Sequence, residues 1–224
     1  KLMWVHHTHD SEVWPPQGVL YADAVRNALG EAGAAEQFRI RWTEHAEHVP
    51  PMMTGESLGR AATTCLIDYL PVIEQSLADL VDWVENGVEP APTAYEYHDG
   101  RVILPKTAKE RGGIQPVVRA SANGAAVAEV AVGEQVELEV HAEVPPGAGT
   151  IVDVEWDFDG SGEFPVRHDE IDGAVTEITL RTTHSYSERG TYFPTALVHS
   201  HRDGDPEAEF RRIPNLAQVR VIVT

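Results

Sequence analysis

Cysteine, basic residues and long apolar runs are all scarce in this sequence. Its 224 residues include one cysteine, Cys65, which cannot form an intrachain disulfide and is expected to be a small buried hydrophobic residue. Lysine and arginine total 17 against 36 acidic residues, and the formal charge of -19 repels the phosphate backbone of nucleic acids. No run reaches the roughly 18 apolar residues of a membrane-spanning helix. We therefore expect no disulfide framework, no nucleic-acid partner and no membrane span.

What is present suits two modest domains. Hydrophobic residues make up 42% of the chain and charged residues 24%, which is close to the globular average and sufficient for a packed core. The pattern of apolar and polar residues changes near Gly113, after a stretch rich in proline, glycine and charged residues. We therefore expect one unit over residues 1–88, a partly ordered connector over residues 89–114 and a second unit over residues 115–224.

The first unit alternates between strand-like and helix-like patterns. Residues 1–5 form a short apolar run, residues 18–32 carry apolar side chains three and four positions apart, and residues 38–42 alternate with a period of two. Residues 67–87 again show helical spacing, end in glycine and are followed by prolines. This order of strand, helix, strand and helix predicts an α/β unit.

The second unit has no helical pattern and reads as a series of short strands. Turn signals such as Asn123-Gly124 and Pro145-Pro146-Gly147 separate the apolar runs. About seven strands at this spacing predict a β-sandwich. The expected strands are residues 117–120, 126–132, 136–144, 151–158, 175–183, 191–199 and 216–223.

A motif in the second unit resembles the polycystic-kidney-disease (PKD) domain. It consists of Trp156-Asp157-Phe158-Asp159-Gly160-Ser161-Gly162, then Thr183-His184-Ser185-Tyr186, then Gly190-Thr191-Tyr192. The resemblance covers nearly all of residues 115–224 and implies an immunoglobulin-like β-sandwich. It also implies an accessory or interaction role in a secreted or cell-surface protein, with a polysaccharide or surface ligand, and no reaction of its own.

The same motif places oxygen-bearing side chains at every second residue. Asp157, Asp159, Ser161 and Glu163 have the spacing of the first half of a calcium-binding loop. The alternative is that these side chains accept hydrogen bonds from the backbone of the turn. Calcium is the one cofactor that the sequence suggests.

The first unit resembles the final third of an α/β-hydrolase of the tannase and feruloyl-esterase type. Asp10 follows the first strand and His48 follows the second, in the order that the acid and the histidine have in that fold. Tyr21 lies in the intervening helix, as in those esterases. The resemblance makes Asp10 and His48 the catalytic acid and base, with Glu12 and His45 as reserve candidates.

The serine nucleophile of such an enzyme has no good candidate in this chain. The single Gly-x-Ser-x-Gly match is Gly55-Glu56-Ser57-Leu58-Gly59, which follows two prolines rather than a strand and comes after the acid and the histidine. We therefore expect the nucleophile in an upstream segment or chain that completes the sheet. The chain is expected to be inactive alone, as the carboxyl-terminal part of a secreted serine esterase that acts on an ester.

The sequence leaves two other hypotheses about the first unit open. The first is a metal site, because ligand-type residues gather on two loops that an α/β sheet would place side by side: His6, His7, His9, Asp10, His45 and His48. The second is a noncatalytic extracellular or cell-surface interaction protein, in which the first unit is only structural.

Overall fold

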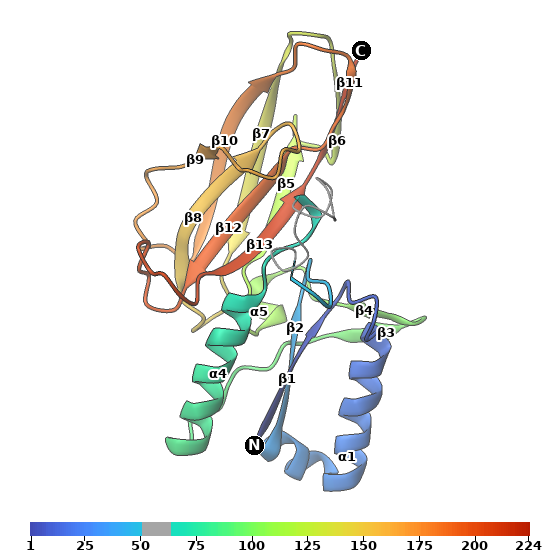
Figure 1. Ribbon diagram of the computed structural model, residues 1–224, viewed down its shortest axis with the longest axis vertical. Helices are drawn as coiled ribbons and strands as arrows, with labels where there is room; N and C mark the ends of the chain where they lie inside the picture. The colour runs from blue at the N-terminus through green and yellow to red at the C-terminus, as the bar shows by residue number, and fades with distance from the viewer. Residues whose placement is uncertain (51–63) are drawn as a thin grey trace.

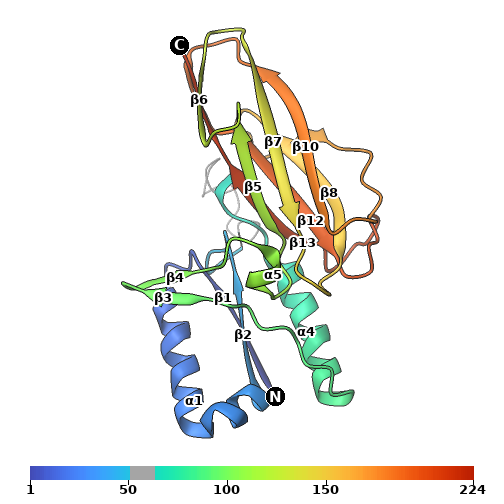
Figure 2. The same cartoon turned by 180° about the vertical axis from the view of Figure 1, so that it is seen from behind.

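The computed structural model describes residues 1–50 and 64–224, which form a small α/β unit and a long β-sandwich stacked end to end (Figure 1). In the α/β unit, β1 (Leu2–His7) pairs in parallel with β2 (Phe38–Thr43), and α1 (Pro15–Gln37) makes the crossover between them. A second helix, α4 (Leu70–Glu85), contacts β1. Both views place α1 and α4 on opposite sides of the two strands (Figures 1 and 2). The predicted α/β unit is present.

The helix α1 is longer than the sequence pattern suggests. It begins at Pro15 and Pro16, whose missing N–H groups cost nothing in the first turn of a helix. Glycines such as Gly30 and Gly33 favour the end of a helix, but Gly30 only kinks α1, with φ 71°, and the helix resumes and ends at Gln37. Gly18 is needed for packing, because a Cβ there would lie 2.3 Å from the ring of His6.

The connecting segment is ordered and packs on the α/β unit. It forms a hairpin of β3 (Glu96–His98) and β4 (Arg101–Ile103), followed by the short helix α5 (Ala108–Arg111). Tyr95, Val102 and Leu104 pack on a small core formed by α1 and β2. The connector therefore covers one face of the two-stranded sheet.

The sandwich consists of two facing layers of strands. One layer has the order β10-β7-β5 and the other has β13-β12-β8-β9, extended by β11-β14-β6, which ends near the C-terminus (Figure 1). Pairing is antiparallel except between β6 and β14. The strands are β5 (Val117–Ala122), β6 (Val127–Val130), β7 (Gln135–Glu143), β8 (Thr150–Asp157), β9 (Val166–Arg167), β10 (Glu177–Ser185), β11 (Gly190–Tyr192), β12 (Thr195–His201), β13 (Ile213–Gln218) and β14 (Arg220–Val223).

The strands follow the predicted positions with two interruptions, except that β9 is not predicted and β13 begins at Ile213, before the predicted run over residues 216–223. The run predicted over residues 191–199 is broken at Pro194 into β11 and β12, and the run predicted over residues 216–223 is broken at Val219 into β13 and β14. The N–H of Val219 donates to the carbonyl of Pro194 at 3.1 Å, so both breaks fall at one place. Proline has no N–H to donate and therefore interrupts a strand ladder.

Aromatic rings of the PKD-like motif form a continuous series inside the sandwich. Trp156, fully buried, contacts Phe158, Phe158 stacks on His184, His184 contacts Tyr186, and Tyr186 stacks on Tyr192 with ring centroids 4.0 Å apart. The Tyr186 hydroxyl donates to the carbonyl of Phe158 at 3.0 Å. The motif thus joins the two layers, because Trp156 lies in β8 of one layer and His184 lies in β10 of the other.

The two units share buried contacts rather than a flexible joint. Val72 of α4 belongs to the same apolar cluster as the sandwich core, and Leu216 of β13 packs with Ala46 and Ile67. Burying apolar surface between them stabilises one relative placement.

Cys65, which the sequence predicts to be buried, is exposed at the junction of the units, where Gln218 Nε2 lies 3.9 Å from its sulfur. None of the helices that the structure describes is long and apolar enough to cross a bilayer.

Candidate active site

The loops that carry Asp10 and His48 leave the same end of the two-stranded sheet. The pairing of β1 with β2 runs to His7 and Thr43 and continues into the loops, where Thr8 N donates to the Thr43 carbonyl and His9 N to that of Ala46. Because neighbouring parallel strands end at the same edge of a sheet, residues three to five positions beyond them meet there.

Asp10 and His48 form a hydrogen-bonded pair. Oδ2 of Asp10 lies 3.1 Å from Nδ1 of His48. A carboxylate can only accept, so Nδ1 carries the proton and Nε2 of the neutral ring is left as an acceptor. Asp10 is buried, whereas the His48 side chain is 39% exposed. The pair thus has one end fixed inside the protein and the other at the surface.

Asp10 is held as a carboxylate by three donors. Burial acts to raise its pKa, but donation from the Val13 N–H at 2.7 Å, from His48 and from the Glu12 N–H at 3.0 Å lowers the pKa below the ordinary value. The carboxylate remains charged at neutral pH. It can therefore fix the orientation of the imidazole and stabilise its protonated form.

The surroundings of His48 favour its protonated form. The hydrogen bond to Asp10 raises its pKa, burial opposes this, and the charges of Asp10, Glu12 and Glu47 raise it further. Glu12 Oε2 lies 3.8 Å from Nε2, so the reserve acid is on the opposite side of the ring from Asp10. These shifts suit a base that must accept a proton during a reaction.

Backbone contacts fix the position of His48 in its loop. The Tyr69 hydroxyl donates to the His48 carbonyl at 2.6 Å, and Glu47 Oε1 accepts from the N–H groups of both His48 and Ser11. The loop carrying the acid and the loop carrying the histidine are therefore tied together by Glu47 as well as by the pair itself.

The other histidines of this end do not converge on one point. The ring of His6 packs on Trp42 and that of His7 on Tyr69, with centroids 4.9 and 4.0 Å apart. His9 stacks on His45, whose Nδ1 lies 2.8 Å from Asn215 Oδ1 in the sandwich rather than facing Asp10. Over residues 1–50 and 64–224, these histidines form no group with ligand atoms mutually within 4.8 Å. The geometry therefore offers no support for the metal hypothesis at this position.

An apolar groove runs along the outer edge of β1. In the part of the chain that the structure describes, β1 pairs with β2 on one side and with no strand on the other. A groove of about 360 Å³ follows this free edge, lined by β1, by Tyr21 of α1 and by α4. Leu2, Tyr21 and Leu77 are each more than 40% exposed there. Parallel sheets are normally buried on both faces and extended at their edges, so this edge is unusually bare.

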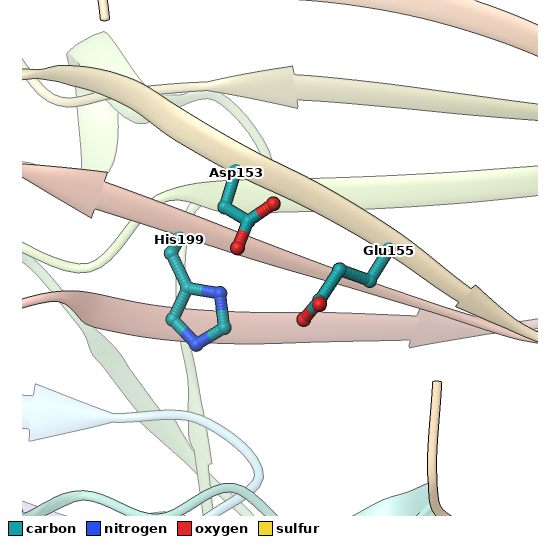
Figure 3. Close-up of side chains that lie close together, drawn as sticks. All are labelled: Asp153, Glu155 and His199. Carbon is teal, nitrogen blue, oxygen red and sulfur yellow. The ribbon is translucent and has the colours of Figure 1, made fainter. Parts of the chain in front are cut away.

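A second cluster of titratable groups lies on the outer face of the sandwich. Asp153 and Glu155 of β8 and His199 of β12 gather in a pocket of about 470 Å³ (Figure 3). Arg167 binds both carboxylate oxygens of Asp153, at 2.9 and 2.6 Å, and Arg212 donates to one of them at 2.6 Å. Because two guanidinium groups already compensate the buried carboxylate, we interpret the cluster as an ion-pair network rather than a cation site.

In the acidic turn after β8, the carboxylate of Asp157 accepts hydrogen bonds from the backbone. Both oxygens of Asp157 are occupied: Oδ1 accepts from the N–H groups of Asp159, Gly160 and Ser161, and Oδ2 accepts from that of Gly162. The Asp157 carboxylate therefore stabilises the backbone of the turn. Calcium binding by Asp157, Asp159, Ser161 and Glu163 stays a prediction, and it would require an ion to compete with these donors.

The Gly55 to Gly59 match, including Ser57, lies outside the described residues. Sequence patterns also gave no indication of three residues that contact the His48 loop, Tyr69, Gln115 and Asn215. Tyr69 lies within the helical pattern of residues 67–87 but directly before α4 in the structure, and the two amides lie in the other unit.

Comparison with known proteins finds similarity in solved structures alone. No protein-family model matches the chain, and no curated protein matches it. The CARDB domain of PF1109 from Pyrococcus furiosus is 20% identical, with a TM-score of 0.34, over 49% of this chain and 94% of that one. The PKD domain of an M14-like peptidase from a Thermoplasmatales archaeon is 11% identical, with a TM-score of 0.33, over 49% and 92%.

The fibronectin(III)-like modules of Clostridium thermocellum CbhA are 15% identical, with a TM-score of 0.31, over 60% of this chain and 64% of that one. All of these neighbours are β-sandwich domains. The description of this chain as a sandwich rests on its own strand order, with facing layers of mainly antiparallel strands.

Proposed function

We propose that this chain supplies the acid and the base of a serine esterase, with Asp10 as the acid and His48 as the base. The observation that carries the proposal is the 3.1 Å contact between Asp10 Oδ2 and His48 Nδ1 at the shared end of two parallel strands. In the order Asp then His after successive strands, this is the arrangement of an α/β-hydrolase. The resemblance of residues 1–88 to tannase and feruloyl-esterase-type enzymes gives the same assignment.

The chemistry assigns each group a step. His48 Nε2 takes the proton of a serine hydroxyl as its oxygen attacks the ester carbonyl, and it then returns that proton to the departing alcohol. Asp10 keeps the proton of the imidazole on Nδ1 and stabilises the imidazolium that forms. Water repeats the sequence on the acyl-enzyme and releases the carboxylic acid.

The serine in this proposal comes from polypeptide that adds to the free edge of β1. A strand paired there in parallel would lie about 4.8 Å from β1 and would end at the same edge as Asp10 and His48. Its apolar side chains would cover the groove between Tyr21 and Leu77. Such an addition would also remove the exposed edge, which otherwise invites nonspecific pairing.

Within the immunoglobulin-like class, we assign the sandwich to the PKD type on the motif from Trp156 to Gly162. In this assignment it is an accessory module of a secreted or cell-surface enzyme, and it performs no reaction. Its ring series and buried Asp157 are structural features of the fold.

Labelling with a fluorophosphonate tests the proposal. Native protein would be isolated from its source through an affinity reagent against residues 115–224, labelled, and mapped by intact mass and peptide sequencing. We expect covalent label on a serine outside this chain but bound to it, and loss of labelling when Asp10→Asn or His48→Gln is introduced.

Other outcomes of this experiment are equally informative. Label on Ser57 would place the nucleophile within this chain, and Ser57→Ala would then abolish labelling. Native material that takes no label, although a control serine hydrolase in the same extract does, would contradict the esterase and favour the noncatalytic interaction protein.

A further inference from the structure

Two buried amide side chains of the sandwich direct their hydrogen bonds at the loop that carries His48. Gln115 lies just before β5 and Asn215 lies in β13, and both are at most 4% exposed. Their partners include Glu44 and His45, which are four and three positions before His48. The sequence separations are 71 and 170 residues, so these contacts exist only in the folded chain.

Gln115 holds the backbone of Glu44 from both sides. Its Oε1 accepts from the Glu44 N–H at 2.8 Å, and its Nε2 donates to the Glu44 carbonyl at 3.2 Å. The same Nε2 donates to the Pro214 carbonyl at 3.0 Å, which links the loop to β13. The amide therefore acts on the main chain of the loop like a short piece of paired strand.

Asn215 fixes the next residue of the loop. Its Oδ1 lies 2.8 Å from His45 Nδ1, and its Nδ2 donates to the Pro116 carbonyl at 2.7 Å. His45 has φ 55°, a left-handed conformation that residues other than glycine adopt rarely. A contact that holds its side chain therefore helps to maintain the turn that directs the chain toward His48.

Contact between the two units does not require buried amide side chains at these positions. Val72, Leu216 and the ion pair between Arg202 and Asp79 already join the two units. Buried amides are costly unless each donor and acceptor is satisfied, and apolar residues would pack the same interface without that cost. Polar groups satisfied by one particular loop conformation specify that conformation.

We infer that Gln115 and Asn215 are positioning residues, through which the sandwich holds the loop from Thr43 to His48 so that His48 meets Asp10. A catalytic role for this positioning rests on the proposed function. The contacts from which we infer the positioning, however, all lie within this chain. The sandwich is then part of the support of the candidate active site, in addition to any ligand that it binds.

The test measures the His48 imidazole directly by nuclear magnetic resonance in the 224-residue chain labelled with ¹⁵N and ¹³C histidine. The titratable groups that interact with His48 are Asp10, Glu12, Glu47, His6 and His7, and the pKa difference between wild type and Asp10→Asn measures the effect of Asp10 among them. In Gln115→Met and Asn215→Leu, which keep side-chain size, we expect at least half of that difference to be lost. The ring should also lose its preference for the tautomer protonated at Nδ1.

Matched variants keep the inference falsifiable. Thr195→Val removes a buried sandwich hydroxyl that contacts Phe193 and Gln218 rather than the His48 loop, and it should leave the pKa of His48 unchanged. Gln115→Leu serves if Gln115→Met fails to fold, because it also removes both hydrogen bonds to the Glu44 backbone without burying an unpaired charge. An unchanged pKa and tautomer in folded Gln115→Met and Asn215→Leu would overturn the inference.

The two proposals fail in different ways. If Asp10→Asn itself leaves the His48 imidazole unchanged, the pair is not formed and both proposals are overturned. If Asp10→Asn and the two amide variants shift the pKa as expected but native protein takes no fluorophosphonate label, the esterase is wrong while the positioning role of Gln115 and Asn215 stands.

Discussion

A carboxylate oxygen of Asp79 accepts a hydrogen bond from Nη2 of Arg41 at 2.8 Å, and both side chains are nearly inaccessible to solvent. Arg41 also donates to Ser76 Oγ at 2.7 Å, and Arg202 of the sandwich approaches Asp79 at 3.1 Å. One carboxylate in α4 thus joins the strand that leads to His48 with the second unit.

Replacing that carboxylate is expected to be severe. Asp79→Ala would leave the Arg41 guanidinium buried without its charge partner, which typically costs about 3 to 5 kcal/mol. Urea denaturation should show this as a large fall in the free energy of unfolding. Asp23→Ala is the control, because the pair of Asp23 with Arg26 is exposed and is expected to contribute about 0.5 kcal/mol or less. Similar losses in both variants would contradict the assignment.

Gly18 is predicted to be required for the approach of α1 to β1. A Cβ at this position would lie 2.3 Å from His6 and 3.1 Å from Trp42, so Gly18→Ala should destabilise the chain by about 1 to 3 kcal/mol through overpacking. Thermal denaturation of Gly18→Ala, His6→Ala and the double variant would form a double-mutant cycle. Because His6→Ala removes the obstructing ring, the double variant should recover much of the loss, and strict additivity would argue against the clash.

Stability should decline as the pH falls from about 6.5 to 4. Burial lowers the pKa of His7 and of His199 from the ordinary 6.5 to about 4. Between pH 4 and 6.5 the unfolded chain therefore binds more protons than the folded one. Each group then removes about 1.4 kcal/mol per pH unit on acidification and has no effect above 6.5. His48 acts in the opposite sense, since its raised pKa adds stability once the pH falls below that raised value.

Denaturation at a series of pH values checks these signs. The slope between pH 4 and 6.5 should become shallower in His7→Gln and in His199→Gln. His98→Gln should leave it unchanged, since its side chain is 76% exposed. A slope that none of the buried variants alters would assign the acid sensitivity to other groups.

The acidic turn after β8 gives a further prediction. Four backbone N–H groups donate to Asp157, so Asp157→Ala would leave several donors without their partner and should destabilise the sandwich by about 1 to 3 kcal/mol. Glu163→Ala, in the same turn, serves as the control. Calorimetry of both variants would show whether the loss is specific to Asp157, and equal melting temperatures would contradict a structural role.

The sequence predicts most of the helices and strands of this fold, because the spacing of apolar residues along a short segment is enough to indicate each of them. Period-two alternation identifies the strands of the sandwich, but it does not register the breaks at Pro194, which lacks an N–H, and at Val219, whose N–H donates to the Pro194 carbonyl. The meeting of Asp10 and His48 follows from a general rule about parallel strands, which needs only their positions after β1 and β2. Their catalytic role stays a prediction.

Contacts between distant segments leave no such pattern. Nothing around Asn215 indicates that its amide reaches His45, since that contact depends on how β13 is placed against the α/β unit. The exposure of Cys65 is missed for the same reason, because residue type predicts average burial while the junction of the two units decides the actual value. The continuation of α1 beyond Gly30 is missed because a glycine with a positive φ can kink a helix as well as end it, and Gly30 takes φ 71° between two helical stretches.

The shared core of the two units has a geometric consequence for any ligand of the sandwich. Since Val72 belongs to the same apolar cluster as Trp156, the sandwich cannot swing independently of the strands that lead to Asp10 and His48. A surface or polymer captured by the sandwich would be presented to His48 at one fixed distance and angle. The distance between the bound part of such a polymer and His48 would therefore be set by the dimensions of the folded protein and not by the length of a flexible linker.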